Sequence, residues 1–193
     1  DVHCVSVEHK LGIKASPTCV MAFGDNGGAR GWLVGNLNQG INNMFTMMNV
    51  MRLGVGLQGV GLMERAYQHA LAYAKERVVF GRPIGQNQGV AFPIARAHAQ
   101  GRAAKLMTYH AADLYDAGKP CAEEANTAKL LASEASWQAA DTCLQTHGGF
   151  GFAEEYDVER KFRETRLYQV APISTNLILS YVGEHVLGMP KSY

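Results

Sequence analysis

The sequence has little of what marks a disulfide scaffold, a zinc protein, a membrane protein or a nucleic-acid binder. Its four cysteines form no CxxC pair and no pairing with histidine at metal spacing, so neither a disulfide framework nor a zinc site is expected. Eighteen basic and seventeen acidic side chains give a formal charge of +1, which provides no overall attraction for nucleic acid or an anionic membrane. There is no signal peptide and no apolar run near the ~20 residues of a membrane span, so a cytoplasmic protein is expected.

Two short segments near the start predict β-strands. Residues 2–7 and 18–23 are rich in valine and small side chains, and GDNGGARG at 24–31 has turn chemistry ahead of a possible third strand at 32–34. We therefore predict two or three antiparallel strands with a hairpin. So small a sheet is marginal alone, and the chain opens on Asp1 without a methionine. We expect it to be the downstream part of a longer protein whose sheet continues upstream.

The rest of the 193 residues, in a chain that is 47% hydrophobic, is predicted to be helical. Apolar side chains recur at spacings of three and four over 41–75, 90–117 and 121–146, and shorter helices are expected at 155–165 and 174–187. Long helices joined by short turns favour an antiparallel four-helix bundle, so the fold class is mainly α with a few antiparallel strands. The predicted buried stripes are Ala103, Leu106, Met107, Ala111 and Leu114 in the second helix, and Ala128, Leu131, Ala132, Ala135, Ala139 and Cys143 in the third.

Two patterns inside the first helix favour packing over ligand binding. GVGLQG at 54–59 matches the dinucleotide fingerprint by letter, but no strand precedes it, so close helix contact is the favoured interpretation. The methionines at 44, 47, 48 and 51 have helical spacing, which predicts core packing, with an adaptable apolar pocket as the alternative.

Two glycine-containing segments are candidates for binding an anion. KERVVFGRPIGQNQ at 75–88 places Arg77 and Arg82 around Phe80, a set suited to a pyrophosphate and a stacked ring, and a solvated loop is the alternative. QTHGGFGFAEEY at 145–156 has three glycines whose N–H groups can hold an anion, and a plain helix stop is equally compatible. His147 has no partner at catalytic spacing and is interpreted as structural.

Taken together, these segments resemble the acyl-CoA dehydrogenase family, in the family's order and over almost the whole chain. ERVVFGRPIGQNQ resembles the pattern ERxxFGxxLxxxQ, QTHGGFGF resembles QxxGGxGF, and FRETRLYQV resembles xRDAxxYQI. EHKLGIKASPTC resembles KxGxRxSxT, and the closing EHVLGMPKSY resembles the ending of a bacterial branch. The resemblance implies that residues 1–36 are the C-terminal part of a β-domain and residues 37–193 a helical C-terminal domain, in a flavoprotein oxidoreductase of fatty acid metabolism.

The resemblance also implies ligands, partners and residue roles. FAD and an acyl-CoA thioester would bind, an acceptor such as an electron-transfer flavoprotein would take the electrons, and the chain would form a homo- or hetero-oligomer, a dimer or tetramer. Arg52 matches an arginine near the acyl-CoA site. The residues implied to contact FAD, some of them from the neighbouring subunit, are Arg77, Phe80, Gln88, Gln145, Gly148, Gly149, Ser174 and Asn176.

The residue that the resemblance makes the catalytic base is missing. The family's glutamate follows the tyrosine of YQI by four positions, where this chain has Pro172, and its second known location holds Met51. No acidic residue occurs between positions 164 and 184, or between 25 and 64, so a shifted register supplies none. Pro172 also lacks the backbone N–H that the family aims at the thioester carbonyl. It does suit the first turn of the last helix, with Ser174 and Thr175 as cap candidates.

Three functional hypotheses follow. The first is an FAD-dependent acyl-CoA dehydrogenase that forms the enoyl-CoA, passes a hydride to flavin N5 and takes its base from elsewhere; this part alone is then expected to be inactive. The second is a related flavoenzyme whose chemistry needs no base here. The third is a non-catalytic companion subunit or scaffold that supplies FAD contacts to an active partner.

Overall fold

The computed structural model describes residues 1–191, with Asn49 described by its backbone alone. The chain divides into two compact units, residues 1–47 and the part from Met48 onward. In the first unit, strand β1 (Val2–Val7) pairs antiparallel with β2 (Cys19–Phe23), from Val2 against Phe23 to Val7 against Cys19. This confirms the predicted hairpin.

The prediction of a possible third strand at 32–34 is wrong. Trp32, Leu33 and Val34 form no strand, and their side chains are 84%, 68% and 80% exposed. A strand needs a partner for its backbone N–H and C=O groups, and in the described chain β1 and β2 pair only with each other. A short apolar segment after a turn motif therefore did not suffice to form a strand at this position.

The helical segments agree with the predicted ones to within a few residues. They are α1 (Gly40–Glu76), α2 (Gln88–Asp116), α3 (Ala122–His147), α4 (Val158–Thr165) and α5 (Thr175–Tyr181), the last continued by a π-helical turn at Val182–Val186. A small hairpin of β3 (Val78–Val79) and β4 (Arg82–Pro83) joins α1 to α2. Single 3₁₀ turns lie at Ile84–Gln86, Gly148–Phe152, Glu154–Tyr156 and Arg166–Gln169.

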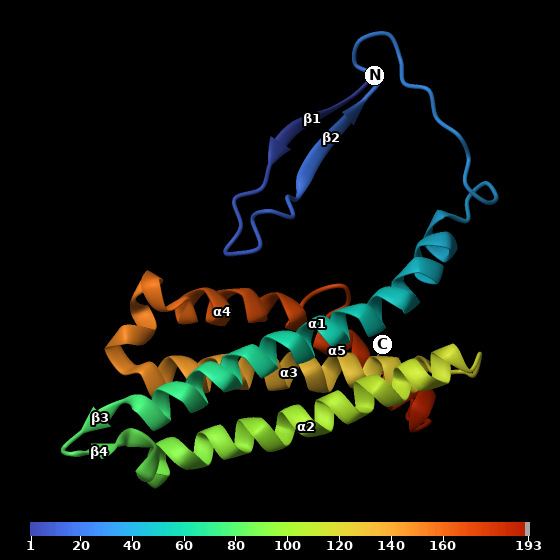
Figure 1. The fold of residues 1–193 in the computed structure, drawn as a ribbon. Coiled ribbons are helices and arrows are strands. Elements are labelled where there is room, and N and C mark those ends of the chain that lie inside the picture. The colour runs from blue at the N-terminus through green and yellow to red at the C-terminus, as the bar shows by residue number, and fades with distance from the viewer. Residues whose placement is uncertain (192–193) are drawn as a thin grey trace. The chain divides into compact units, whose positions relative to one another are not determined.

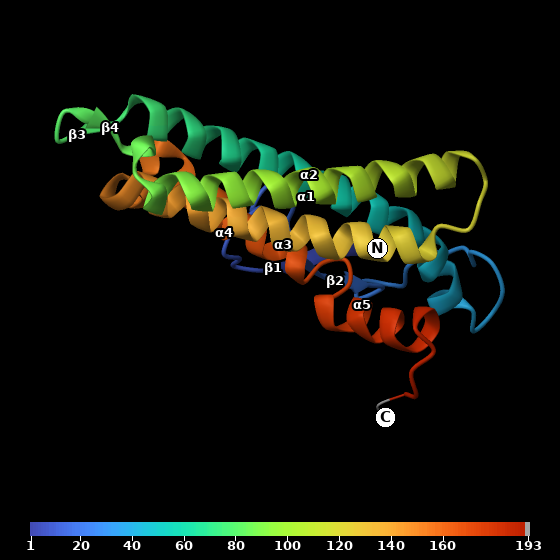
Figure 2. The ribbon, with the colours of Figure 1, turned by 90° about the horizontal axis from the view of Figure 1, so that it is seen from below.

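The three long helices lie side by side, with α4 along the same bundle and the β3–β4 hairpin projecting beyond one end (Figures 1 and 2). Glycines permit the close approach of α1 and α3. A Cβ added to Gly59 would lie 3.1 Å from the carbonyl oxygen of Ala132, and one added to Gly56 would lie 3.6 Å from the backbone nitrogen of Lys129. The packing interpretation of GVGLQG is confirmed for these two glycines.

The core is built mostly from small side chains, which suits closely spaced helices. The predicted stripe of α3 is confirmed at five of its positions, and Leu131 is only partly buried against it. The clustered core residues are Val60, Met63, Ala66, Ala70, Ala74, Ile94, Ala97, Ala104, Ala132, Ala135, Ala139, Ala140, Cys143 and Val158.

The stripe predicted for α2 is confirmed at Ala111 and only partly at Met107 and Leu114, which are half-buried, and it is wrong at Ala103 and Leu106, which are exposed. Its buried residues are Ile94, Ala97, Gly101, Ala104, Thr108 and Ala111, while Leu106 is 65% exposed. Apart from Ile94, the buried face of α2 consists of small residues, and at one of them a large side chain of α1 occupies the space. Met63 fills the space at Gly101, where an added Cβ would lie 2.3 Å from its Sδ.

The four methionines at 44, 47, 48 and 51 also differ from the prediction of core packing, since Met48 is only half-buried and the other three are exposed. Met44, Met47 and Met51 are 45%, 57% and 44% exposed. Their helical spacing does place them on a helix, but the core of the helical unit begins only further along α1, at Val55 and Val60.

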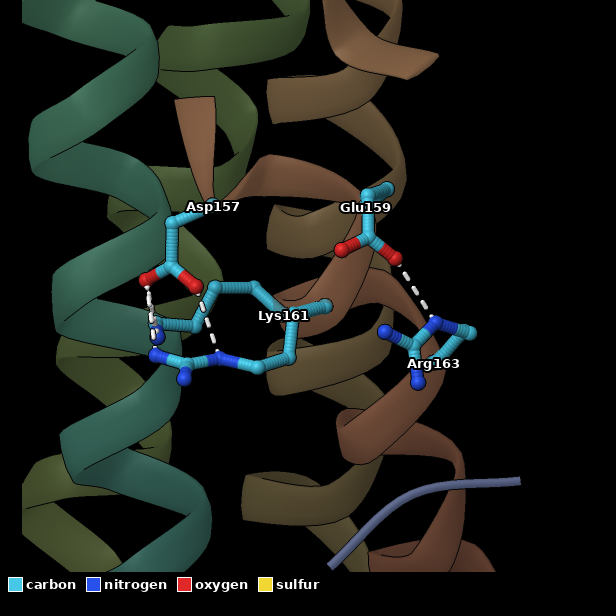
Figure 3. Close-up of polar contacts among 5 residues, drawn as sticks. Asp157, Glu159, Lys161 and Arg163 are labelled. Carbon is cyan, nitrogen blue, oxygen red and sulfur yellow. Dashed lines mark hydrogen bonds and ion pairs between the residues drawn. The ribbon is translucent and has the colours of Figure 1, made fainter. Parts of the chain in front are cut away.

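Helix α4 is fastened by ion pairs at its start (Figure 3). Asp157, at φ 58°, accepts from Arg160 and Lys161, and Glu159 accepts from Arg163 at 2.7 Å. Partial burial works against ionisation of Asp157, but Lys161 and Arg160 hold its pKa below the ordinary value. Each pair is a contact between neighbouring turns of one helix, and such pairs stabilise a short helix modestly.

Among the described residues, none of the helices combines the length and the apolar character that crossing a lipid bilayer requires. The four cysteines are free, and the described residues contain no cluster of three or more metal-ligating side chains. Burial raises the pKa of Cys143 to about 12, so this thiol is an inert part of the core.

Candidate functional site

The hairpin after α1 places an arginine at the end of the bundle. Arg77 continues the last turn of α1 through a bond from its N–H to the Tyr73 carbonyl at 2.9 Å, and its own carbonyl accepts from Ile84 N–H at 2.9 Å. The turn between β3 and β4 uses Phe80 and Gly81 at φ 53° and 77°. A positive φ is unfavourable for phenylalanine, and its side chain is 99% exposed, so nothing within the described chain packs against it.

A glycine turn follows α3 at the same end. Gly148 ends the helix at φ 58°, and a Cβ at Gly148 or Gly149 would meet nothing within 4 Å. Gly151 differs, because a Cβ there would lie 2.6 Å from the Leu144 carbonyl oxygen. The first two glycines therefore leave open space beside the backbone, and the third allows the chain to turn back onto α3.

The two segments meet in one cavity of about 420 Å³. The Arg77 guanidinium lies 5.5 Å from the centre of the Phe150 ring, within range of a cation–π contact. The cavity is lined by Tyr73, Arg77, Val79, Ile84, Thr146, His147, Gly148, Gly149 and Phe150. The structure thus brings together three of the predicted site residues, Arg77, Gly148 and Gly149.

His147 belongs to the wall of this cavity and is held by the protein itself. Its Nδ1–H donates to the Cys143 carbonyl at 2.8 Å, and its ring stacks on Tyr73 with centroids 4.1 Å apart. Tyr156 approaches its edge. These contacts agree with the structural interpretation of this histidine.

Two further predicted residues lie nearby but outside that cavity. Gln145 lines a neighbouring pocket of about 380 Å³ between the end of α3 and the start of α2, together with Gly89 and Pro93. Gln88 is exposed at the first position of α2, next to Gly89. Arg82 donates to the Asn87 side chain at 3.0 Å and does not line the cavity with Arg77.

The turn that carries Pro172 lies ahead of α5. Ser174 caps the helix by accepting from Leu177 N–H at 3.3 Å, as predicted, whereas Pro172 precedes the cap and so lies outside the predicted first turn. Lys129 of α3 donates from Nζ to the Ile173 carbonyl at 2.7 Å. Asn176 is exposed on α5, and Ser174 is half-buried.

Arg52 lies half-buried on α1, near the level at which α1 meets Ala128 and Lys129 of α3. Its Nε atom is buried and has no hydrogen-bond partner, and the same holds for Asn126 Oδ1 on α3. Met51, the neighbouring residue, is 44% exposed.

Comparison with known proteins decides the family. Residues 38–187 match the model of the acyl-CoA dehydrogenase C-terminal domain. The chain belongs to the acyl-CoA dehydrogenase family. It is 36% identical to an acyl-CoA dehydrogenase of Bacillus subtilis over 94% of this chain and 48% of that protein, and 37% identical to the CarC subunit of the caffeyl-CoA reductase–Etf complex of Acetobacterium woodii over 84% and 43%.

The same relationship holds in three dimensions. The solved glutaryl-CoA dehydrogenase complex with glutaryl-CoA matches with a TM-score of 0.88 at 30% identity, over 99% of this chain and 48% of that one. The butyryl-CoA dehydrogenase of Megasphaera elsdenii matches with a TM-score of 0.86 at 29% identity, over 96% and 49%. The chain thus spans about half the length of the relatives it matches.

Homologous acyl-CoA dehydrogenases are flavoproteins, and the cavity near Arg77 fits a part of FAD. Free backbone space at Gly148 and Gly149 lets an anion approach main-chain N–H groups, and the guanidinium of Arg77 suits the pyrophosphate. The exposed ring of Phe80 is available for stacking at the hairpin tip. The donor set therefore agrees with the dinucleotide that the family binds.

Sequence reasoning missed three residues that the acyl-CoA dehydrogenase fold places in or near these sites. Tyr73 is one helical turn before Arg77, a spacing that predicts a shared face and could have found it. Phe150 belongs to the glycine segment, where the sequence pattern indicates no role for it, although its ring lies under Arg77. Lys129 had no signal beyond its position next to Ala128 in a stripe of small residues.

Proposed function

We propose that this chain is the FAD-binding and substrate-binding helical part of an acyl-CoA dehydrogenase, with residues 1–36 contributing to a β-domain and residues 37–193 forming the helical domain. The observation that carries the proposal is the single cavity shared by Arg77, Gly148 and Gly149. Its cation, open glycine backbone and aromatic wall suit the pyrophosphate of FAD. When bound, FAD would supply the hydride acceptor for oxidation of the acyl group.

The remaining assignments follow the family positions. Gln145 lines the neighbouring pocket, Gln88 directly precedes Gly89 of that pocket, and both would hold the nucleotide. Phe80, fully exposed at the hairpin tip, would contact FAD across a subunit interface. Ser174 and Asn176 would contact the flavin end. Arg52, whose buried Nε–H has no partner, would bind near the acyl-CoA.

The base is proposed to come from outside the two family positions, because Pro172 and Met51 carry no titratable group. A positioned base contributes on the order of 10² to 10⁴ in rate, so the reaction needs a carboxylate supplied from elsewhere in the assembly. An electron-transfer flavoprotein is the proposed acceptor. The relative CarC, named as part of an Etf complex, supports a partner of this class.

A second candidate function is a companion subunit that lends FAD contacts to an active partner chain. Pro172 favours it, because proline removes both the carboxylate and the backbone N–H from that position. The two candidates differ in one assay. Acyl-CoA oxidation by this protein alone supports the enzyme, whereas activity that arises only after mixing with a glutamate-bearing acyl-CoA dehydrogenase chain supports the companion.

The FAD site has its own test. Arg77→Ala removes the guanidinium from the cavity, and Arg82→Ala is the matched control, since Arg82 bonds Asn87 outside it. We expect FAD titration, followed by flavin fluorescence quenching, to show at least tenfold weaker binding for Arg77→Ala only. Equal losses in the two variants would contradict the assignment of this cavity to FAD.

A further inference from the structure

Lys129 is a buried cation without an acidic partner in the described structure. Its side chain is 0% exposed, on the face of α3 that meets Gly56 of α1. The ion pairs among the described residues join other groups, and burial alone lowers the pKa of Lys129, to about 8. Lysine is almost never fully buried unless it is paired. The hydrogen bond that Lys129 does make is therefore expected to stabilise the segment that accepts it.

That bond ends in the turn where the family keeps its base. The Nζ of Lys129 lies 2.7 Å from the carbonyl oxygen of Ile173, 44 residues further along the chain. Ile173 stands between Pro172 and the cap residue Ser174. A charged donor makes a stronger hydrogen bond than a neutral one, and a buried bond is not weakened by water.

The turn at residues 172–174 leads directly into α5 and supplies its cap. Ser174 accepts from Leu177 N–H through its side chain and from Ile178 N–H, at 3.2 Å, through its carbonyl. Ile178 is 0% exposed, so the first turn of α5 is anchored in the interior. Helix α5 has only seven residues before its π-helical continuation at Val182–Val186, and a helical segment this short is not stable alone, so its position depends on such anchors.

We propose that Lys129 is the positioning residue of the Pro172–Ser174 turn, and that its hydrogen bond to Ile173 fixes this turn and the start of α5 against α3. The inference rests on the proposed function in one respect, because the turn matters for the reaction only if flavin and thioester meet beside it. Lys129 acts through Ile173 and is not itself a catalytic residue. Pro172 has no N–H, so the backbone at position 172 cannot donate a hydrogen bond that would hold the turn. The bond from Lys129 to the adjacent Ile173 carbonyl holds it instead.

The test compares Lys129→Met with Lys161→Met by hydrogen–deuterium exchange. Lys161 is also mostly buried, at 12% exposure, but it pairs with Asp157 at the start of α4. For Lys129→Met we expect exchange at residues 175–182 to rise at least tenfold, with α1 and α2 unchanged. Lys161→Met should leave 175–182 as in the wild type. Unchanged exchange there in Lys129→Met, or an equal rise in every helix, overturns the proposal.

Two further measurements keep the proposal testable if Lys129→Met does not fold. Lys129→Gln keeps an N–H donor on a shorter side chain, so its exchange at 175–182 should lie between those of the wild type and a variant without a donor. In the wild-type chain with ¹⁵N-labelled lysine, the ammonium of Lys129 should exchange slowly with water below pH 8. A set of lysine ammonium groups that all exchange rapidly contradicts the buried hydrogen bond.

The functional consequence is measured on the flavin-loaded protein expressed from its complete reading frame. At saturating acyl-CoA, Lys129→Met should bleach the flavin at least tenfold more slowly than the wild type, while Lys161→Met keeps the wild-type rate. Bleaching of Lys129→Met at the wild-type rate overturns the positioning role. A wild-type protein that does not bleach contradicts the proposed function instead, and the exchange experiment then still decides whether Lys129 fixes the turn.

Discussion

Burial of Lys129 makes the stability of the helical unit depend on pH in a defined direction. Its pKa falls from the ordinary value of about 10.5 to about 8 because the charged form is desolvated. Between these two values the unfolded chain binds a proton that the native chain has released, so the free energy of unfolding rises with pH. At about 1.4 kcal/mol per pH unit, a fall of about 2.5 units amounts to about 3 kcal/mol.

Lys129→Met removes this titration and isolates its effect. Near pH 7 the variant loses the bond to Ile173, whose unpaired carbonyl costs about 1–3 kcal/mol, but it also loses a costly buried charge. The two proteins should therefore be similarly stable at pH 7. At pH 10 the wild type should be more stable by a further margin of about 3 kcal/mol, less the small part not yet titrated.

The assay is urea unfolding followed by far-ultraviolet circular dichroism at pH 7, 8.5 and 10, with Lys161→Met as the matched control. The control measures the part of the pH dependence that any lysine-to-methionine change produces. The reasoning is refuted if the difference between wild type and Lys129→Met does not change with pH, or if it changes in the opposite direction.

Three other predictions concern glycines and the α5 cap. Gly59→Ala should destabilise the protein by about 1–3 kcal/mol in thermal unfolding, because the added Cβ would crowd Ala132. Gly61→Ala, where the added Cβ meets open space, should stabilise it by about 0.5–1 kcal/mol. Similar effects of the two substitutions would contradict the α1–α3 contact. Gly148→Ala should cost about 1–2 kcal/mol at its positive φ, while Gly149→Ala should leave stability unchanged and weaken FAD binding in a fluorescence titration. Ser174→Ala should cost about 1 kcal/mol in urea unfolding, and no loss would argue against the cap.

The helices could be predicted from the sequence because their spacing and their end signals agree. Segment 121–146 has acidic residues in its first turn and glycine after its last, and α3 occupies Ala122–His147. The buried face of α2 could not be predicted, since it depends on which neighbour supplies the bulk. Met63 from α1 fills the space at Gly101, so the larger residues of α2 turn outward, although hydrophobicity alone favoured burying Leu106.

The sequence could predict the two segments of the candidate site, but not that they lie together. By itself each segment is equally compatible with a loop or a helix end, and only the resemblance to family motifs assigned roles to its residues. Only the fold shows that Arg77 and Gly148 line one cavity, and that Phe150 supports the guanidinium. The role of Lys129 could not be predicted from the sequence, because its partner is a backbone carbonyl and every residue type has one.

The central claim is that this protein belongs to an acyl-CoA dehydrogenase that holds FAD and oxidises an acyl-CoA without a glutamate at position 172. The most direct test is the anaerobic visible spectrum of the protein expressed from its complete reading frame, before and after adding a panel of acyl-CoAs of different length and branching. The account predicts a flavin band that bleaches with at least one of them. A protein without a flavin band, or a band that persists with every acyl-CoA, would contradict it.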